Sequence, residues 1–204
     1  MRPCLVIVCG VPGSGKSTFA LHVADRWGAT KFASETFAEE LGTAARTLSG
    51  DLSKEAIAHA YSAMGAAVRH SLETNKLVVA VGTFRSEEQR GRFRDIATNS
   101  GASAMTLRVV CPIEIAANRV RSRFASGERG PNETAIRQID AELNRASDVD
   151  IVFANESSVE HFHRRIDAAI QVLELDSDHD ASVAAIVQRL EKLTIGEIAS
   201  TRDF

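Results

Sequence analysis

The stretch Gly10-Val11-Pro12-Gly13-Ser14-Gly15-Lys16-Ser17-Thr18 follows directly on the apolar run Cys4-Leu5-Val6-Ile7-Val8-Cys9. It contains the complete pattern G-x-x-x-x-G-K-[ST], in which glycines let successive backbone N–H groups turn toward one anion. Lys16 then reaches the β and γ phosphates, and the Ser17 hydroxyl is placed for Mg²⁺. The pattern predicts a phosphate loop for a nucleoside triphosphate.

The surroundings of this loop favour a ligand over a glycine-rich turn without one. A β-branched strand precedes the loop, and residues 19–24 continue from it with helical spacing. The helix is expected to run from about Gly15 to Trp27 and to end at Gly28, which suits a left-handed helix terminus. Strand, loop and helix are therefore all present in the required order.

Composition limits the class of protein. The 204 residues, 44% of them hydrophobic, suffice for one α/β domain with a short appendage. A net charge of −3 gives no global attraction to nucleic acid or anionic membranes. The three cysteines, Cys4, Cys9 and Cys111, lie in or beside apolar runs, so free thiols are expected. No leader or membrane-spanning run is visible, which favours a cytoplasmic protein.

Strands and helices alternate along the rest of the chain. Further strands are expected at 29–33, 77–81, 105–111 and 150–154, and further helices at 36–41, 54–74, 86–99, 112–124, from 132 or 133 past 143, and from 157 to about 173. Capping patterns support several of these helix starts, notably Ser86 with Gln89. The alternation predicts a three-layer α/β/α fold with a mainly parallel five-stranded sheet.

Two domain-level expectations follow. The main domain should occupy residues 1–175, with a small helical lid at about 125–145, where Gly127, Gly130 and Pro131 make the composition flexible. Residues 176–204 should form a helical appendage whose apolar stripe, residues 183–193, packs either on this domain or on a second subunit. A homodimer through that helix is thus one of two alternatives.

At this point the chain resembles the small P-loop kinases, a group of P-loop NTPases that includes nucleoside monophosphate, gluconate and shikimate kinases, polynucleotide kinase, and zeta-toxin-like and AAA-type ATP-binding kinases. The resemblance covers about residues 3–175 and is most specific in the phosphate loop, in Ser34-Glu35 after the second strand, and in Arg119-Val120-Arg121-Ser122-Arg123 before the lid. It implies ATP and Mg²⁺ as cofactors. The ATP-binding residues would be Gly10, Pro12, Gly13, Ser14, Gly15, Lys16, Ser17 and Thr18, with Ser17 on the metal.

The resemblance also implies catalytic roles. Glu35, at the carboxyl end of the second strand, would face the phosphate acceptor as a base, and Arg119 and Arg123 would contact the transferring phosphate alongside Lys16. Independently of any family, their i, i+4 spacing places the two arginines on one helix face, where pairing with Glu114 or Glu128 is the alternative. Arg85 and Arg90 are weaker candidates for binding an anionic acceptor. Arg90, Arg92 and Arg94 are expected to form mostly a solvated face.

One departure from the family separates the candidate functions. Many relatives carry an Asp that holds a Mg²⁺-bound water where this chain has Val81, although the following Gly82-Thr83-Phe84 turn is kept. A kinase acting on a small molecule or nucleic-acid end is the leading hypothesis, and a non-catalytic or weakly hydrolysing ATP-binding regulatory protein is the alternative. A GTPase is less favoured, because no N-K-x-D segment is present to read guanine. No substrate signature identifies the acceptor.

Overall fold

The computed structural model describes residues 3–42, 53–74, 77–125, 130–155, 160–164, 166 and 167. Contacts divide the chain into one unit of residues 2–156 and another of residue 1 with 157–204. In the second unit, residues 160–164, 166 and 167 are helical, and Phe162 and Ile166 are buried as predicted. The expected domain boundary near 175, the terminal helix and its dimer contact lie outside the described residues.

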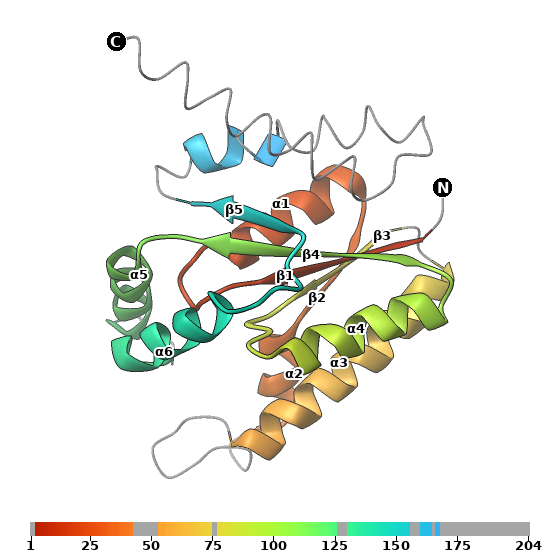
Figure 1. Cartoon of the computed structure of the whole chain (residues 1–204), viewed down its shortest axis with the longest axis horizontal. Helices are drawn as coiled ribbons and strands as arrows, with labels where there is room; N and C mark the ends of the chain where they lie inside the picture. Colours follow the sequence, from red (N-terminus) through yellow and green to blue (C-terminus); the bar gives the residue numbers. More distant parts are fainter. Residues whose placement is uncertain are drawn as a thin grey trace. The chain divides into compact units, whose positions relative to one another are not determined.

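A five-stranded sheet forms the centre of residues 2–156 (Figure 1). Its strands are β1 (Cys4–Cys9), β2 (Thr30–Ala33), β3 (Leu77–Val81), β4 (Ser103–Val110) and β5 (Ile151–Ala154). They lie in the order β2-β3-β1-β4-β5, and every pairing is parallel. The predicted parallel five-stranded sheet is confirmed, and β4 begins two residues earlier than expected and ends one residue earlier.

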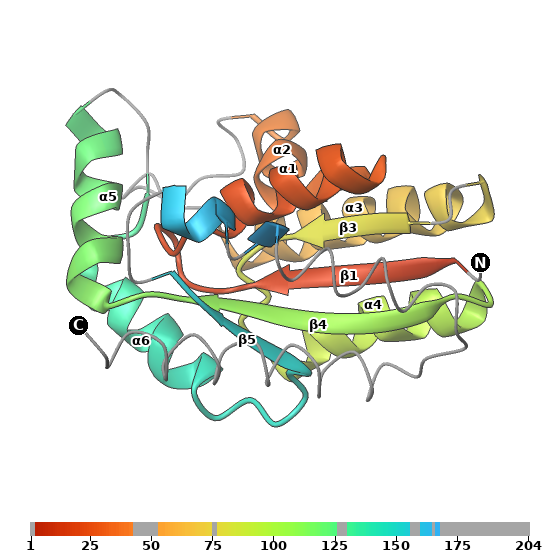
Figure 2. The same ribbon diagram turned by 90° about the horizontal axis from the view of Figure 1, so that it is seen from above.

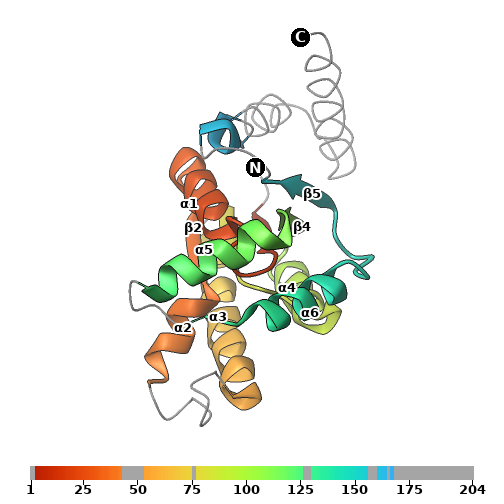
Figure 3. The same ribbon diagram turned by 90° about the vertical axis from the view of Figure 1, so that its left-hand side faces the viewer.

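Helices cover both faces of this sheet. They are α1 (Lys16–Trp27), α2 (Ser34–Glu40), α3 (Lys54–Thr74), α4 (Glu87–Asn99), α5 (Ile113–Ala125) and α6 (Glu133–Leu143). Figure 3 shows α1 on one face and α3 with α4 on the other, while α5 extends beyond the carboxyl ends of the strands in Figure 2. The predicted three-layer arrangement is therefore confirmed.

Local sequence signals set several helix ends. Ser86 accepts a hydrogen bond from the Gln89 backbone N–H at 3.2 Å, and the Gln89 side chain accepts one from the Ser86 N–H at 3.2 Å. This reciprocal capping box is the one predicted. Gly28 ends α1 in the left-handed conformation, with φ 64°. The Asn132 side chain caps α6 by accepting from the Ala135 N–H at 2.9 Å.

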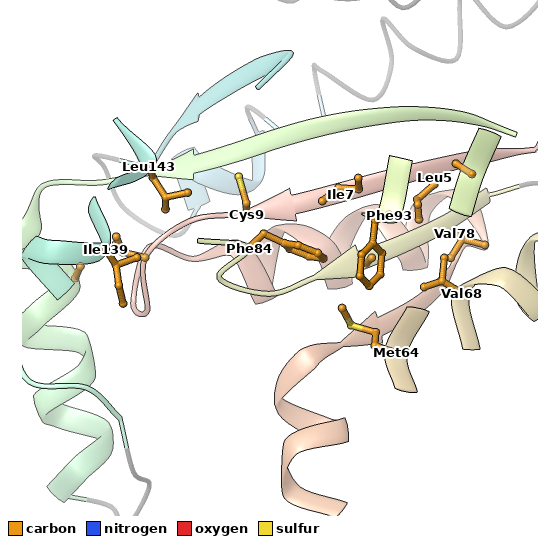
Figure 4. Packing of buried hydrophobic residues seen from close by; sticks show 14 of the residues in the cluster. Leu5, Ile7, Cys9, Met64, Val68, Val78, Phe84, Phe93, Ile139 and Leu143 are labelled. Atoms are coloured by element: carbon orange, nitrogen blue, oxygen red, sulfur yellow. The ribbon is translucent and has the colours of Figure 1, made fainter. Parts of the chain in front are cut away.

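The core lies between the sheet and the layer of α3 and α4. Alternate residues of β1 face this layer, where Met64, Val68 and Phe93 meet them (Figure 4). Leu143 from α6 is only 1% exposed and belongs to the same cluster. Because α6 is packed into this core, the part of the predicted lid formed by residues 133–143 is anchored to the domain.

Candidate functional site

The phosphate loop lies at the carboxyl end of β1, in the middle of the sheet. The register of the strands determines which residues lie near the loop. Val8 of β1 pairs with Val81 of β3, and Val81 pairs with Ala33 of β2. The residues following these strands therefore meet at one edge, as open parallel sheets arrange their ligand sites. The Gly82 N–H donates to the Val8 carbonyl at 3.1 Å, and the Gly10 N–H to the Thr83 carbonyl at 3.4 Å.

Two glycines of the loop leave no room for a side chain. A Cβ at Gly10 would lie 2.5 Å from the Val109 carbonyl oxygen, and one at Gly13 would lie 2.4 Å from the Ala116 carbonyl oxygen. Gly13 also has φ 84°, which other residues rarely adopt. The loop is thus seated against β4 and the first turns of α5. Its glycines are required by space as well as by backbone conformation.

Lys16 is buried, with 3% of its surface exposed, and its Nζ donates to the Val11 carbonyl at 3.2 Å. Burial lowers the pKa of Lys16, the carboxylate of Glu35 raises it, and the charge of Arg123 lowers it further; the net direction is down. The charge of Lys16 is therefore influenced by two of the other predicted catalytic residues, Glu35 and Arg123.

Arg119 reaches the loop directly. Its guanidinium Nη1 donates to the Gly13 carbonyl at 3.2 Å, from a half-buried position on α5. Among the described residues, Glu114 accepts a hydrogen bond from Arg137, at 3.2 Å, and forms no ion pair with Arg119. The other alternative partner, Glu128, lies outside the described residues. Arg123 follows one turn later on the same face, at an exposed position.

Glu35 lies in the first turn of α2, exposed, directly after β2. Its neighbour Ser34 contacts the Tyr61 hydroxyl, which also accepts from the Phe84 N–H at 2.9 Å. Burial raises the pKa of Tyr61 to about 12, against smaller lowering effects of its hydrogen bonds with Phe84 and Ser34. A Cβ at Gly82 would lie 2.8 Å from both the Ser34 and Tyr61 hydroxyls, so a side chain there would have to displace these two groups.

The expectation for Arg90 was wrong. Arg90 is 1% exposed, its Nη1 donates to the Phe84 carbonyl at 2.7 Å, and its other nitrogens bind both carboxylate oxygens of Asp148 at 2.6 and 2.8 Å. Arg85 likewise pairs with Glu142 of α6. Arg90 is held inside the fold because the turn after β3 and the loop before β5 provide its hydrogen-bond acceptors. It therefore belongs to the core and not to a solvated face.

Ser17 and Thr18 stand exposed at the start of α1, whereas Ser14 is fully buried. The Ser14 Oγ has no hydrogen-bond partner among the described residues, and its N–H donates to the Val11 carbonyl at 3.1 Å. A buried hydroxyl without a partner beside a backbone cradle suits a loop built to hold a polar ligand. The loop residues therefore fit a phosphate group. The exposed Ser17 hydroxyl fits Mg²⁺, which takes few protein oxygens and keeps several waters.

The sequence interpretation missed Asn155. It directly follows β5, and its Nδ2 donates to the Ser14 carbonyl at 2.8 Å from a position only 4% exposed. Its place at the carboxyl end of a parallel strand was the available signal. Its link to a residue 141 positions earlier was not readable from the sequence.

Among the described helices, none combines the length and apolarity needed to cross a bilayer. The described residues also include no group of three or more His, Cys, Asp or Glu side chains that could hold a metal ion by themselves.

The same fold occurs in solved structures of low sequence identity. A candidate kinase from Chloroflexus aurantiacus has a TM-score of 0.63 at 19% identity, covering 85% of this chain and 97% of that one. The APS kinase CysC of Mycobacterium tuberculosis, solved with AMPPNP and APS, has a TM-score of 0.61 at 18% identity, covering 85% and 98%. A gluconokinase from Sinorhizobium meliloti has a TM-score of 0.57 at 16% identity, covering 96% and 98%.

No curated protein matches the chain. The AAA domain family, in contrast, matches residues 5–147, which contain the phosphate loop, Glu35, Arg119 and Arg123. The sheet order and the shared architecture of the solved kinases agree with this match. The chain therefore belongs to the AAA domain family and has the α/β fold of the small P-loop kinases.

Proposed function

We propose that the chain is a kinase that binds ATP with Mg²⁺ at residues 10–18 and transfers the γ-phosphate to a small molecule or nucleic-acid end. The observation that carries this proposal is the position of Lys16. Its buried ammonium donates to the loop carbonyl of Val11, and both Glu35 and Arg123 act on its charge. A buried cation beside a glycine-rich loop, influenced by a carboxylate and a second cation, is suited to binding an anionic substrate.

The residues divide the work of phosphoryl transfer, which asks a protein mainly for positioning and charge neutralisation. Lys16 and the loop N–H groups would hold the phosphates, and the exposed Ser17 hydroxyl would bind the metal. Arg119, anchored on the Gly13 carbonyl, and Arg123 would neutralise charge on the transferring group. Glu35 would accept the proton of the acceptor hydroxyl. Bound ATP and Mg²⁺ supply the electrophilic phosphorus and the metal's charge.

The alternative is a non-catalytic or weakly hydrolysing ATP-binding regulatory protein, and one observation favours it. Val81 is fully buried and paired with Val8 and Ala33, where many kinases of this type place a carboxylate. Valine offers no acceptor for a metal-bound water. Glu35 is exposed at the same sheet edge, and its carboxylate raises the pKa of Lys16. The kinase proposal therefore requires Glu35 to serve the metal's waters as well as the acceptor.

Glu35→Gln separates these functions, because the amide keeps the shape of the side chain and loses its charge and basicity. The matched control is Glu39→Gln, an exposed change on the same helix. ATP binding would be followed by calorimetry, and turnover would be measured with a panel of hydroxyl-bearing metabolites and nucleic-acid ends. We expect Glu35→Gln to lose transfer while it binds ATP, and Glu39→Gln to retain both.

Full transfer by Glu35→Gln would remove this residue as the base. ATP binding by the parent protein without phosphate transfer to any acceptor would favour the regulatory alternative. Absence of ATP binding by the parent would overturn both.

A further inference from the structure

We propose that Asn155 is a positioning residue of the phosphate loop, whose side-chain amide holds the Ser14 carbonyl outward so that the next N–H, of Gly15, is turned to the phosphate side. The inference rests on the proposed function, because it assigns how the ATP-binding loop keeps its shape. Asn155 lies outside the loop motif and outside the set of residues named above as catalytic or ATP-binding.

Asn155 is held at both its backbone and its side chain. Its N–H donates to the Val110 carbonyl at 2.7 Å, which continues the pairing of β4 and β5 by one residue. Its Nδ2 then donates to the Ser14 carbonyl at 2.8 Å, and the side chain is 4% exposed. A buried amide without a partner would be costly, so this bond gives the residue one defined orientation.

The loop needs such a restraint because glycines flank Ser14. Gly13 has φ 84° and Gly15 has φ 98°. Because glycine has no Cβ, the peptide groups on either side of Ser14 can rotate more easily than those between other residues. In a trans peptide the C=O and the following N–H point in opposite directions. A donor that fixes the Ser14 carbonyl on one side therefore fixes the Gly15 N–H on the other.

Arg119 provides the corresponding restraint one residue earlier, by donating to the Gly13 carbonyl at 3.2 Å. The two donors come from α5 and from the end of β5, so consecutive loop carbonyls are held by separate parts of the fold. Arg119 carries a charge that phosphates also attract, whereas Asn155 is neutral. Asn155 is thus the residue at which positioning can be tested apart from charge.

The experiment uses the full chain with two variants, Asn155→Ala and Asn155→Asp, and with Asn99→Asp as an exposed control for the same chemical change. Calorimetry would measure the affinity for two probes with Mg²⁺: a non-hydrolysable ATP analogue and inorganic triphosphate, which lacks the base and sugar. Thermal denaturation would show that each variant is folded. We expect Asn155→Ala to weaken both probes by about tenfold, the worth of one buried hydrogen bond.

Asn155→Asp adds a pH signature. Its carboxylate keeps the shape but cannot donate to the Ser14 carbonyl, whereas the protonated acid can. Burial raises the pKa of such a carboxyl above its ordinary value of about 3.9. The weakening of both probes should therefore shrink as the pH is lowered from about 8 to about 5.5. Asn155→Ala, which has no titrating group at this position, should show a constant ratio to the parent protein.

The outcomes are separable. Equal weakening of both probes in folded Asn155→Ala supports positioning of the loop. Weakening confined to the ATP analogue would overturn it, since Asn155 would then contact the base or sugar. Unchanged affinity, with or without a loss of thermal stability, would overturn it too. If the parent protein binds neither probe, the proposed function itself fails, whereas a binding parent with an unaffected Asn155→Ala removes only this inference.

Discussion

The Nζ atom of Lys16 lies 3.2 Å from the carbonyl oxygen of Val11, within the same loop. The ammonium is thus aimed inward by a backbone acceptor and shielded from solvent, with 3% of the residue exposed. Holding the long side chain in one conformation reduces the entropy that would be lost when it binds an anion. This contact is the structural basis of the first prediction.

Lys16→Ala should weaken ATP binding by about fiftyfold or more, because a charge-assisted hydrogen bond to phosphate is lost. Lys31→Ala, at an exposed position on β2, is the control for removing one lysine and should leave affinity unchanged. Calorimetry on both variants makes the comparison. Unchanged affinity in a folded Lys16→Ala protein would contradict the assignment of residues 10–18 as the nucleotide site.

Arg123→Ala should lower turnover by about a hundredfold with little change in the KM for ATP, since a neutralising charge acts mainly on the transition state. Arg121→Ala is the matched control, because Arg121 lies on the same helix, is exposed and binds the side chain of Asn118.

Arg119→Ala should differ from both variants. It removes the donor to the Gly13 carbonyl, so the KM for ATP should rise as kcat falls. Steady-state kinetics that show a change in KM alone for Arg123→Ala would contradict a transition-state role.

Asp148→Ala should lower the free energy of unfolding by about 3 kcal/mol, because it leaves the buried guanidinium of Arg90 without its carboxylate. Glu88→Gln breaks an exposed pair with Arg92 and should cost less than about 0.5 kcal/mol. Urea denaturation of the two variants compares a buried ion pair with an exposed one on the same helix. Equal losses would show that the Arg90 pair contributes no more than a surface pair.

The same pair has a predictable pH dependence. Burial acts to raise the pKa of Asp148, but the hydrogen bonds and charge of Arg90 outweigh it, and the net pKa lies below the ordinary 3.8. Because the pKa of Asp148 is lower in the folded protein than in the unfolded chain, the ionised carboxylate stabilises the fold at any pH above its ordinary pKa. This stabilisation is lost as the pH falls through the lowered pKa of the folded state. The stability difference between the parent protein and Asp148→Ala should therefore be full at neutral pH and shrink below pH 3.8.

Tyr61→Phe should cost about 1–2 kcal/mol near neutral pH, because the buried Phe84 N–H loses its acceptor. The pKa of Tyr61 is raised from 10.0 to about 12, so the parent protein should lose stability as the pH rises from 10 toward 12. The variant should lack this alkaline loss. Tyr61 is the single tyrosine of the chain, so absorbance titration of the phenol reports this residue alone. A midpoint near 10 would contradict the burial of its hydroxyl.

The sequence by itself determined the features that depend on neighbouring residues. The capping box at Ser86 and the helix end at Gly28 were both predicted correctly, because each arises from interactions within a few positions of the chain. The phosphate loop was recognised from its contiguous motif, although distant segments hold its carbonyls. The parallel sheet was likewise predictable, since alternating strands and helices leave few other topologies.

Only the tertiary structure decided which polar side chains are buried and what they bind. Arg90 carries the same charge as the exposed Arg92, but it meets Asp148, 58 positions later, and is removed from solvent. Asn155 contacts the phosphate loop through a hydrogen bond to Ser14, 141 positions earlier. These pairings follow from the strand order β2-β3-β1-β4-β5, which brings distant segments together. Hydrophobic periodicity shows that a strand or helix exists but not which other element lies beside it, so the partners of charged and polar groups emerge only when the sheet is assembled.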